Sequence, residues 1–104
     1  MHGVLEGSAQ WYYEDGKKSV EYSYHNGKLE GTATVYNREG IVSEMGEYKD
    51  NIQSGHWKEF SENGKLKEDG EYVNGEKNGP WKEYDILGQF VRTVNYRNGK
   101  ESKR

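Results

Sequence analysis

Hydrophobic and polar residues alternate in short runs that are separated by regularly spaced turn signals. The runs span five to eight residues and are rich in Tyr, Val, Trp and Thr, which are typical of strands. The spacing between successive turns alternates between 11 and 13 residues. Asn-Gly and Asp-Gly pairs supply the positive φ angles that tight hairpins require. The pattern predicts an antiparallel meander. The turn signals are Asp15-Gly16, Asn26-Gly27, Glu39-Gly40, Asp50-Asn51, Asn63-Gly64, Asn74-Gly75, Leu87-Gly88 and Asn98-Gly99.

The same residue types return every 24 positions without insertion or deletion. Several series in one register indicate copies of one structural unit. The predicted fold is all-β: an elongated single-layer antiparallel meander of four 24-residue β-hairpin repeats. We expect one repeat domain over 1–104, with units of approximately 7–30, 31–54, 55–78 and 79–102. The clearest series are Gly7, Gly31, Gly55 and Gly79; Gly16, Gly40, Gly64 and Gly88; Tyr24, Tyr48, Tyr72 and Tyr96; and Tyr12, Tyr36, Phe60 and Tyr84.

The second strand of each unit alternates between an apolar and a polar face. In the third unit, Leu66, Gly70 and Tyr72 are predicted to share one face, and charged residues the other. We expect the mid-strand glycines, Gly46 and Gly70, to make room for an aromatic ring of a neighbouring strand. The equivalent sets in the neighbouring units are Val42, Gly46 and Tyr48, and Phe90, Val94 and Tyr96; the glycine position of the first unit is Tyr22.

The first strand differs between the two halves of the chain. Trp57 and Trp81 occupy one position in the last two units, whereas Ala9 and Ala33 occupy it in the first two. The residues two positions further on are Trp11 and Val35 in the first two units and Glu59 and Glu83 in the last two. Because residues i and i+2 share a face, we expect the large apolar group to stay on one face and move one step along the strand.

A second aromatic series leaves two interpretations open. Its members follow the tryptophan position by three residues, so in a regular strand they face the other way. A bulge would instead put both series on one side. The series is therefore either part of the core or an exposed binding stripe. Its members are Tyr12, Tyr36, Phe60 and Tyr84.

Composition and charge narrow the function. Hydrophobic residues make up 31% of the chain and charged residues 32%, but nine Tyr, three Trp and two Phe indicate a thin aromatic core. Residues 1–74 carry eight Lys/Arg and fourteen Asp/Glu, a net charge of −6, whereas residues 75–104 carry seven and four, a net charge of +3. An acidic body disfavours nucleic acid and membrane surfaces and favours a basic partner.

Neither catalytic nor cofactor chemistry is apparent in the sequence. The three histidines occupy different repeat positions and there is no Cys, so we expect no metal site, no cofactor, no catalytic residue and no enzymatic activity. The absence of Cys fits a reducing cytoplasm. Residues 1–7 lack the basic start and apolar run of a signal peptide, which also favours a cytoplasmic location.

The unit Gly-x-Trp-x-x-aromatic-x-x-x-Gly, followed by Tyr-x-Asn-Gly, covers 55–75 and 79–99. It resembles the MORN repeat, specifically the bacterial variant found in YwqK-type antitoxins. The resemblance implies an elongated sheet of successive hairpins, and roles in toxin neutralisation, scaffolding, dimerisation or, in eukaryotic members, membrane attachment. The first two units depart from this pattern at Ala9 and Ala33.

The leading hypothesis is an antitoxin or immunity protein that neutralises a toxin by occlusion, and the acidic body makes a basic toxin the expected target. The main alternative is a scaffold or assembly module of a larger MORN-repeat protein. A carbohydrate or peptide binder is a third option, and a homodimer through exposed sheet edges is compatible with each. The residues expected to bind the protein partner are Tyr12, Tyr36, Phe60, Tyr84, Glu44, Glu59, Glu68 and Glu83.

Overall fold

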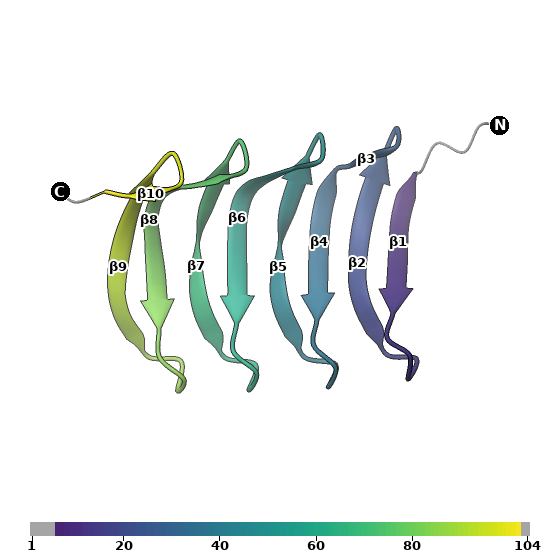
Figure 1. The fold of residues 1–104 in the computed structure, drawn as a ribbon, viewed down its shortest axis with the longest axis horizontal. Helices are drawn as coiled ribbons and strands as arrows, with labels where there is room; N and C mark the ends of the chain where they lie inside the picture. Colours follow the sequence, from purple (N-terminus) through teal and green to yellow (C-terminus); the bar gives the residue numbers. More distant parts are fainter. Residues whose placement is uncertain (1–5, 103–104) are drawn as a thin grey trace.

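The computed structural model describes residues 6–102, and all strands in this part belong to one antiparallel sheet. Residues 1–5, part of the segment searched for a signal peptide, lie outside the described region. Successive hairpins stand side by side in chain order, which confirms the predicted meander (Figure 1). The strands are β1 (Gly7–Tyr12), β2 (Lys18–His25), β3 (Lys28–Leu29), β4 (Gly31–Tyr36), β5 (Val42–Lys49), β6 (Ile52–Phe60), β7 (Leu66–Val73), β8 (Glu76–Tyr84), β9 (Phe90–Arg97) and β10 (Lys100–Glu101).

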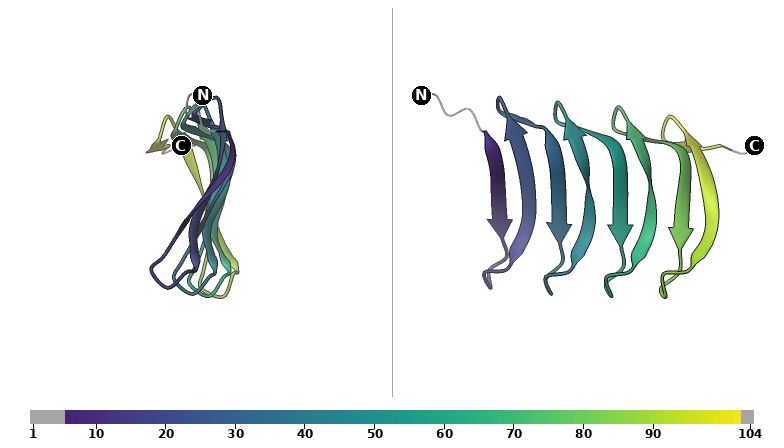
Figure 2. Two further views of the ribbon diagram at one scale, coloured as in Figure 1. Left: turned by 90° about the vertical axis from the view of Figure 1, so that its right-hand side faces the viewer. Right: turned by 180° about the vertical axis from the view of Figure 1, so that it is seen from behind.

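The sheet forms a single, twisted layer. The molecule measures 52 × 31 × 14 Å, and the edge-on view of Figure 2 shows no second layer over either face of the described strands. Both faces are therefore open to solvent or to a partner. The apolar side chains must pack against one another within the layer, because no other element of residues 6–102 covers them.

Two kinds of turn join the strands, one at each end of the hairpins. Turns such as Asn74-Gly75 contain two residues, both with positive φ (53° and 84°), which matches the right-handed twist of the flanking strands. The turns at the other end are longer. In one of them Asn63 Oδ1 accepts a hydrogen bond from Lys65 N at 2.9 Å, and Gly64 has a φ of 87°. The predicted turn signals thus occupy turns of both kinds.

A β-bulge beside each longer turn changes the register. In the third hairpin Glu59 pairs with Glu68, whereas Phe60 pairs with Leu66, so Lys67 is an extra residue of β7. Paired residues share a face of an antiparallel sheet, and Leu66 therefore lies on the face of Phe60. The other three hairpins shift register at the equivalent position.

The bulge divides each second strand between the two faces. We name the face that carries Trp57 the tryptophan face and the face that carries His56 the histidine face. Gly70 pairs with Trp57 and lies on the tryptophan face, while Leu66 lies on the histidine face. The prediction that these two residues share a face is wrong, because the extra residue between them breaks the alternation. The same correction applies to Val42 and Phe90.

The core is a ladder of aromatic rings on the tryptophan face. A Cβ added to Gly46 would lie 2.1 Å from the Trp57 ring, and one added to Gly70 would lie 2.3 Å from the Trp81 ring. The prediction that these glycines make room for an aromatic ring is therefore confirmed. Successive rings meet edge to face at centroid distances of 5.2–6.4 Å, a favourable geometry. The ladder runs through Tyr22, Tyr48, Trp57, Tyr72, Trp81 and Tyr96.

The N-terminal half fills the ladder in another way. Ala33 occupies the tryptophan position and is only 2% exposed. Tyr22, on the preceding strand, replaces the glycine found in later units and packs against this cluster. We expected Val35, two residues along the strand, to replace the large side chain that is missing at Ala33. That expectation is incomplete, because the aromatic ring at this place in the ladder is that of Tyr22 on the neighbouring strand.

Candidate protein-binding site

A row of glutamates crosses the tryptophan face between the tryptophans and the longer turns. Glu59 and Glu83 each follow a tryptophan by two residues and so share its face. In the sheet, Glu59 lies between Glu44 and Glu68. Glu83 pairs with Glu68. These four residues, on four successive strands from β5 to β8, form what we name the acidic row.

Burial and mutual repulsion perturb the acidic row. Burial raises the pKa of Glu44, and the neighbouring Glu59 carboxylate adds to this effect. Burial also raises the pKa of Glu59, with a further contribution from its hydrogen bond with Glu68. Like charges directly opposite on neighbouring strands destabilise a sheet. The acidic row therefore opposes the local stability of the sheet.

Three cations of the chain neutralise part of the row. Lys77 Nζ lies 3.1 Å from Glu68 Oε2, and Arg92 Nε lies 2.7 Å from Glu83 Oε1. Lys67 Nζ is 3.7 Å from Glu59 Oε2. Within residues 6–102 Glu44 has no ion-pair partner. The acidic row therefore keeps an unneutralised carboxylate at its β5 end.

In the N-terminal half of the sheet, apolar residues occupy the positions that continue the acidic row. Val35 pairs with Glu44 on one side and with Val20 on the other. Val20 in turn pairs with Trp11, which is 47% exposed. The tryptophan face thus offers an apolar segment over β1, β2 and β4 and an acidic segment over β5 to β8. A partner that lies along the array meets both.

The second aromatic series lies on the histidine face. Within the third hairpin, β6 keeps a regular register from Gly55 to Glu59, and the extra residue beside the longer turn belongs to β7, so Phe60 points away from Trp57. Tyr12 is 58% exposed, whereas Tyr36, Phe60 and Tyr84 are half-buried. Tyr84 packs edge to face against Phe90 across the hairpin, with ring centroids 6.0 Å apart. The series is neither a closed core nor a fully exposed stripe.

The structure therefore separates the residues predicted to bind one partner. The glutamates lie on the tryptophan face and the second aromatic series on the histidine face, although Glu59 and Phe60 are adjacent in the chain. The two sets do not form one continuous surface on either face. The aromatic groups beside the acidic row are instead those of the ladder, including Trp57, Tyr72 and Trp81.

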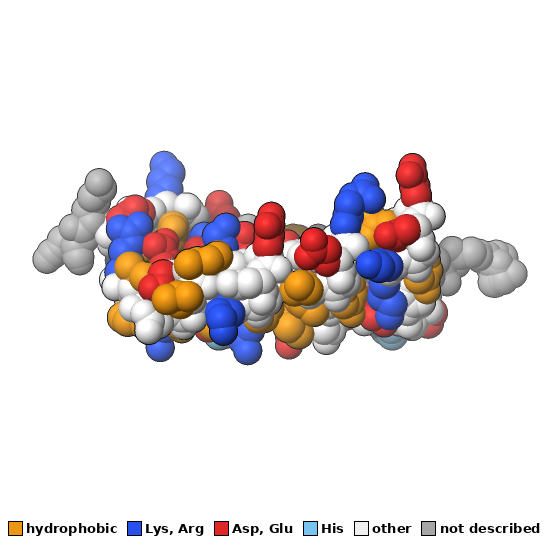
Figure 3. Space-filling view, turned by 90° about the horizontal axis from the view of Figure 1, so that it is seen from below, with side chains coloured by type: hydrophobic (Ala, Val, Ile, Leu, Met, Phe, Trp, Pro, Cys, Tyr) orange, Lys and Arg blue, Asp and Glu red, His pale blue; other side chains and the backbone are white. Residues whose placement is uncertain are grey.

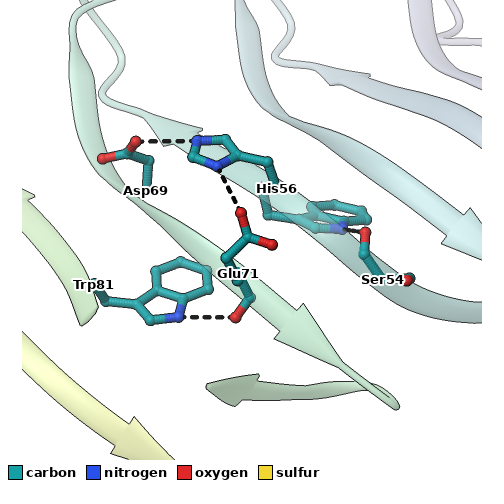
Figure 4. Close-up of polar contacts among 6 residues, drawn as sticks. Ser54, His56, Asp69, Glu71 and Trp81 are labelled. Carbon is teal, nitrogen blue, oxygen red and sulfur yellow. Dashed lines mark hydrogen bonds and ion pairs between the residues drawn. The ribbon is translucent and has the colours of Figure 1, made fainter. Parts of the chain in front are cut away.

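A polar cluster on the histidine face was not predicted. His56 Nε2 lies 3.1 Å from Asp69 Oδ2, and His56 Nδ1 lies 3.3 Å from Glu71 Oε2 (Figure 4). Burial and the nearby Asp69 carboxylate raise the pKa of Tyr84. The sequence signal for this cluster is the cross-strand pairing of His56 with Glu71, which can be read only once the register is known.

Exposed apolar side chains gather at the C-terminal end of the sheet. Ile86 and Leu87, in the last long turn, and Phe90 and Val91, on β9, are 55–65% exposed. Figure 3, which views the molecule from the end with the longer turns, shows hydrophobic groups interspersed with charged ones. β9 and β1 lie at opposite ends of the strand order, apart from the short β10 that pairs with β9.

Two further features of the described residues bear on function. No group of three or more His, Cys, Asp or Glu side chains in residues 6–102 is arranged to hold a metal ion. The same part of the chain contains no helix with the length and apolar character needed to cross a bilayer.

Comparison with known proteins identifies the repeat. The family model described as the MORN repeat variant matches residues 5–26, 29–50 and 53–74, which together make up more than half of the chain. Each match begins 24 residues after the last and spans one hairpin: β1–β2, β4–β5 and β6–β7. The β8–β9 hairpin follows the matched segments and repeats their register, with Trp81 opposite Val94. No curated protein matches the chain.

Proposed function

The chain belongs to the MORN repeat variant family, and we propose that it is a non-catalytic protein that binds a basic protein through the tryptophan face. The family points to a binding or scaffold role. The observation that supports a basic partner is the acidic row, in which Glu44 and Glu59 have raised pKa values. A lysine or arginine of a partner would relieve the repulsion between these carboxylates.

The specific role that we favour is that of an antitoxin or immunity protein that occludes a cognate toxin. A single-layer sheet 52 Å long offers a broad, regular surface that covers a partner without changing shape. Toxins that act on nucleic acids are basic, and an acidic surface both attracts and blocks their binding sites. We place the complex in the cytoplasm and expect it to contain no nucleic acid, cofactor or metal.

Charge reversal tests this proposal. The double variant Glu59→Lys/Glu83→Lys replaces two carboxylates of the acidic row. The matched control, Glu14→Lys/Glu62→Lys, changes the net charge equally, but at exposed turn residues. In cells that express the basic product of a neighbouring gene, we expect the wild type and the control to restore growth and the row variant to fail. Growth restored equally by both variants contradicts the proposal.

Binding of the purified proteins gives a second readout of the same proposal. Electrostatic attraction accelerates association, and salt screens it over about 8–10 Å. We therefore expect the row variant to associate more slowly than the control. The wild-type association rate should fall as salt is added. A rate that is independent of salt contradicts an acidic docking surface.

A scaffold role is the second candidate, and the open edges of the sheet favour it. β1 and β9 end the strand order, apart from the short β10 that pairs with one end of β9. Trp11 and Tyr12 on β1 and Phe90 and Val91 on β9 are exposed. Open edges pair with strands of other chains or of a second copy. An increase in mass with protein concentration in light scattering would favour this role.

A further inference from the structure

The fourth hairpin shows how the tryptophan face holds a cation. Lys77 Nζ lies 4.5 Å from the centre of the Trp81 ring and 4.9 Å from that of Tyr96. The same nitrogen lies 3.1 Å from Glu68 Oε2. Two aromatic rings and one carboxylate thus surround a single ammonium group, which combines cation–π attraction with a charge-assisted hydrogen bond.

The third hairpin contains the same arrangement without the lysine. Trp57, Tyr72 and Glu44 stand 24 residues before Trp81, Tyr96 and Glu68. The centroids of the Trp57 and Tyr72 rings lie 5.7 Å apart with an interplanar angle of 71°. The Trp81 and Tyr96 rings have a similar geometry, with values of 6.4 Å and 78°. The residue at the lysine position is Gln53, which pairs with Tyr48 as Lys77 pairs with Tyr72.

We propose that Trp57, Tyr72 and Glu44 form a cage for the ammonium group of a lysine side chain from the partner protein. Lys77 is the internal precedent, because the chain itself places an ammonium group in the equivalent cage. Glu44 supplies the charge, since no cation within residues 6–102 pairs with it. This inference deepens the proposed function and rests on it for the identity of the partner.

Gln53 stands at the lysine position of the cage, paired with Tyr48. Trp57 is 4% exposed, and Trp81, whose cage holds Lys77, is 2% exposed, so a ligand reaches the Trp57 ring only after side chains at the cage move. Gln53 is half-buried at the surface of a single-layer sheet, where side chains change rotamer within nanoseconds. Its neutral amide brings no positive charge to the cage, and the ammonium group of a partner's lysine would supply one to Glu44.

The N-terminal half lacks the elements of such a cage. In the hairpin of β4 and β5, Ala33 stands at the tryptophan position. The residue in the position of the glutamate is Val20, and the one in the position of the lysine is Leu29. These side chains present neither a charge nor an indole ring. The cage is therefore a local feature of the third hairpin and not a general property of the repeat.

A lysine derivative tests the cage without any partner. The probe is N-acetyl-lysine methylamide, and its control is the norleucine analogue, which lacks the charge. NMR of the indole N–H groups separates the two cages, because Trp57 Nε1 donates to Glu47 O and Trp81 Nε1 donates to Glu71 O. We expect the lysine probe to shift the Trp57 signal saturably and to leave the Trp81 signal unchanged. The norleucine analogue should shift neither.

Three variants and a charge control sharpen the test. Glu44→Gln should weaken binding of the probe by about tenfold or more, because a hydrogen bond to a charged group is lost. Gln53→Lys should abolish binding, because the chain then fills its own cage. Lys77→Gln should open the second cage, so that the Trp81 signal also responds. Glu62→Gln removes an exposed carboxylate elsewhere and should bind the probe as the wild type does.

Several outcomes overturn the inference. One is an unmoved Trp57 signal while the folded spectrum persists. Another is undiminished binding of the probe by Gln53→Lys, and a third is equal weakening by Glu44→Gln and Glu62→Gln. None of these outcomes affects the charge-reversal test of the proposed function, so failure of the cage and failure of the function are distinguishable.

Discussion

The two halves of the sheet build the same aromatic ladder from different residues. In the C-terminal half a tryptophan of one hairpin packs on a glycine of the hairpin before it, as Trp57 does on Gly46. In the N-terminal half the large residue belongs to the earlier hairpin, where Tyr22 packs with the cluster that contains Ala33. A large and a small residue meet in both cases, with their positions exchanged. The repeat therefore maintains the packed ladder and not the residue type at each position.

The large and the small residue can exchange positions because each contact between neighbouring hairpins requires only one aromatic ring, from either strand. Tyr48 meets Trp57 at 5.4 Å on one side and Tyr22 at 6.1 Å on the other. A ring from either strand can therefore continue the edge-to-face contacts. A single-layer sheet depends on this continuity, because no second layer covers the rings of the described strands.

Changing the tryptophan–glycine packing of the C-terminal half into the tyrosine–alanine packing of the N-terminal half should have the largest effects on stability. Trp57→Ala leaves the space above Gly46 empty and should lower the free energy of unfolding by about 3–5 kcal/mol. Gly46→Tyr alone collides with Trp57 and should also destabilise. The double variant copies the Tyr22–Ala33 pair and should recover about 1–3 kcal/mol relative to the sum of the single changes. Urea unfolding measures all three, and additive losses would show that the two solutions are not equivalent.

A single methyl group tests the close approach in the fourth hairpin. Gly70→Ala places a Cβ 2.3 Å from the Trp81 ring and should cost about 1–3 kcal/mol, because the indole must shift. In a Trp81→Ala background the same change should be nearly neutral, since the ring is gone. Thermal unfolding of the two matched pairs gives the comparison. An equal cost in both backgrounds would place the strain elsewhere.

The longer turns should not distinguish the two halves. Gly16 and Gly64 have φ angles of 92° and 87°, which β-branched residues adopt only with strain. Gly16→Val and Gly64→Val should each cost about 1–2 kcal/mol, a shift in melting temperature of several degrees for a domain of this size. A shift below about 2 °C for either variant contradicts the assigned role of that glycine.

The smallest expected effect concerns the acidic row. Burial raises the pKa of Glu44 in the folded protein, so the folded state binds a proton more readily than the unfolded state does. The ionised carboxylate therefore opposes folding fully above its folded pKa. This effect decreases as the pH falls through that value and is absent below the unfolded pKa. Glu44→Gln should stabilise the protein at pH 7 by less than about 1 kcal/mol.

The pH dependence of this effect separates it from a general change in packing. The difference in melting temperature between the wild type and Glu44→Gln should shrink as the solution is acidified, because protonated Glu44 is then also neutral. Melting curves at neutral and acidic pH test this. The control is Glu62→Gln, which removes an exposed carboxylate. A constant difference across this range contradicts the proposed cause.

Much of the architecture follows from local patterns in the sequence. The 24-residue period and the turn signals predict successive hairpins, and the glycine at position 46 predicts a ring above it. Part of the acidic row can also be predicted from the sequence, because Glu59 and Glu83 follow the tryptophans by two residues and so share their face. Its continuity across β5 to β8 requires the register of the strands.

The sequence by itself determined the repeat, the turns and the residues that alternate along each strand, because these depend on local backbone preferences and on a period of two. Only the tertiary structure decided which face the second aromatic series occupies, since that depends on whether the extra residue, such as Lys67, lies on the first or the second strand. The tertiary structure also decided how Tyr22 compensates for Ala33 and where Glu44 lacks a cation. These features arise between hairpins, where packing and charge pairing join residues that no local pattern connects.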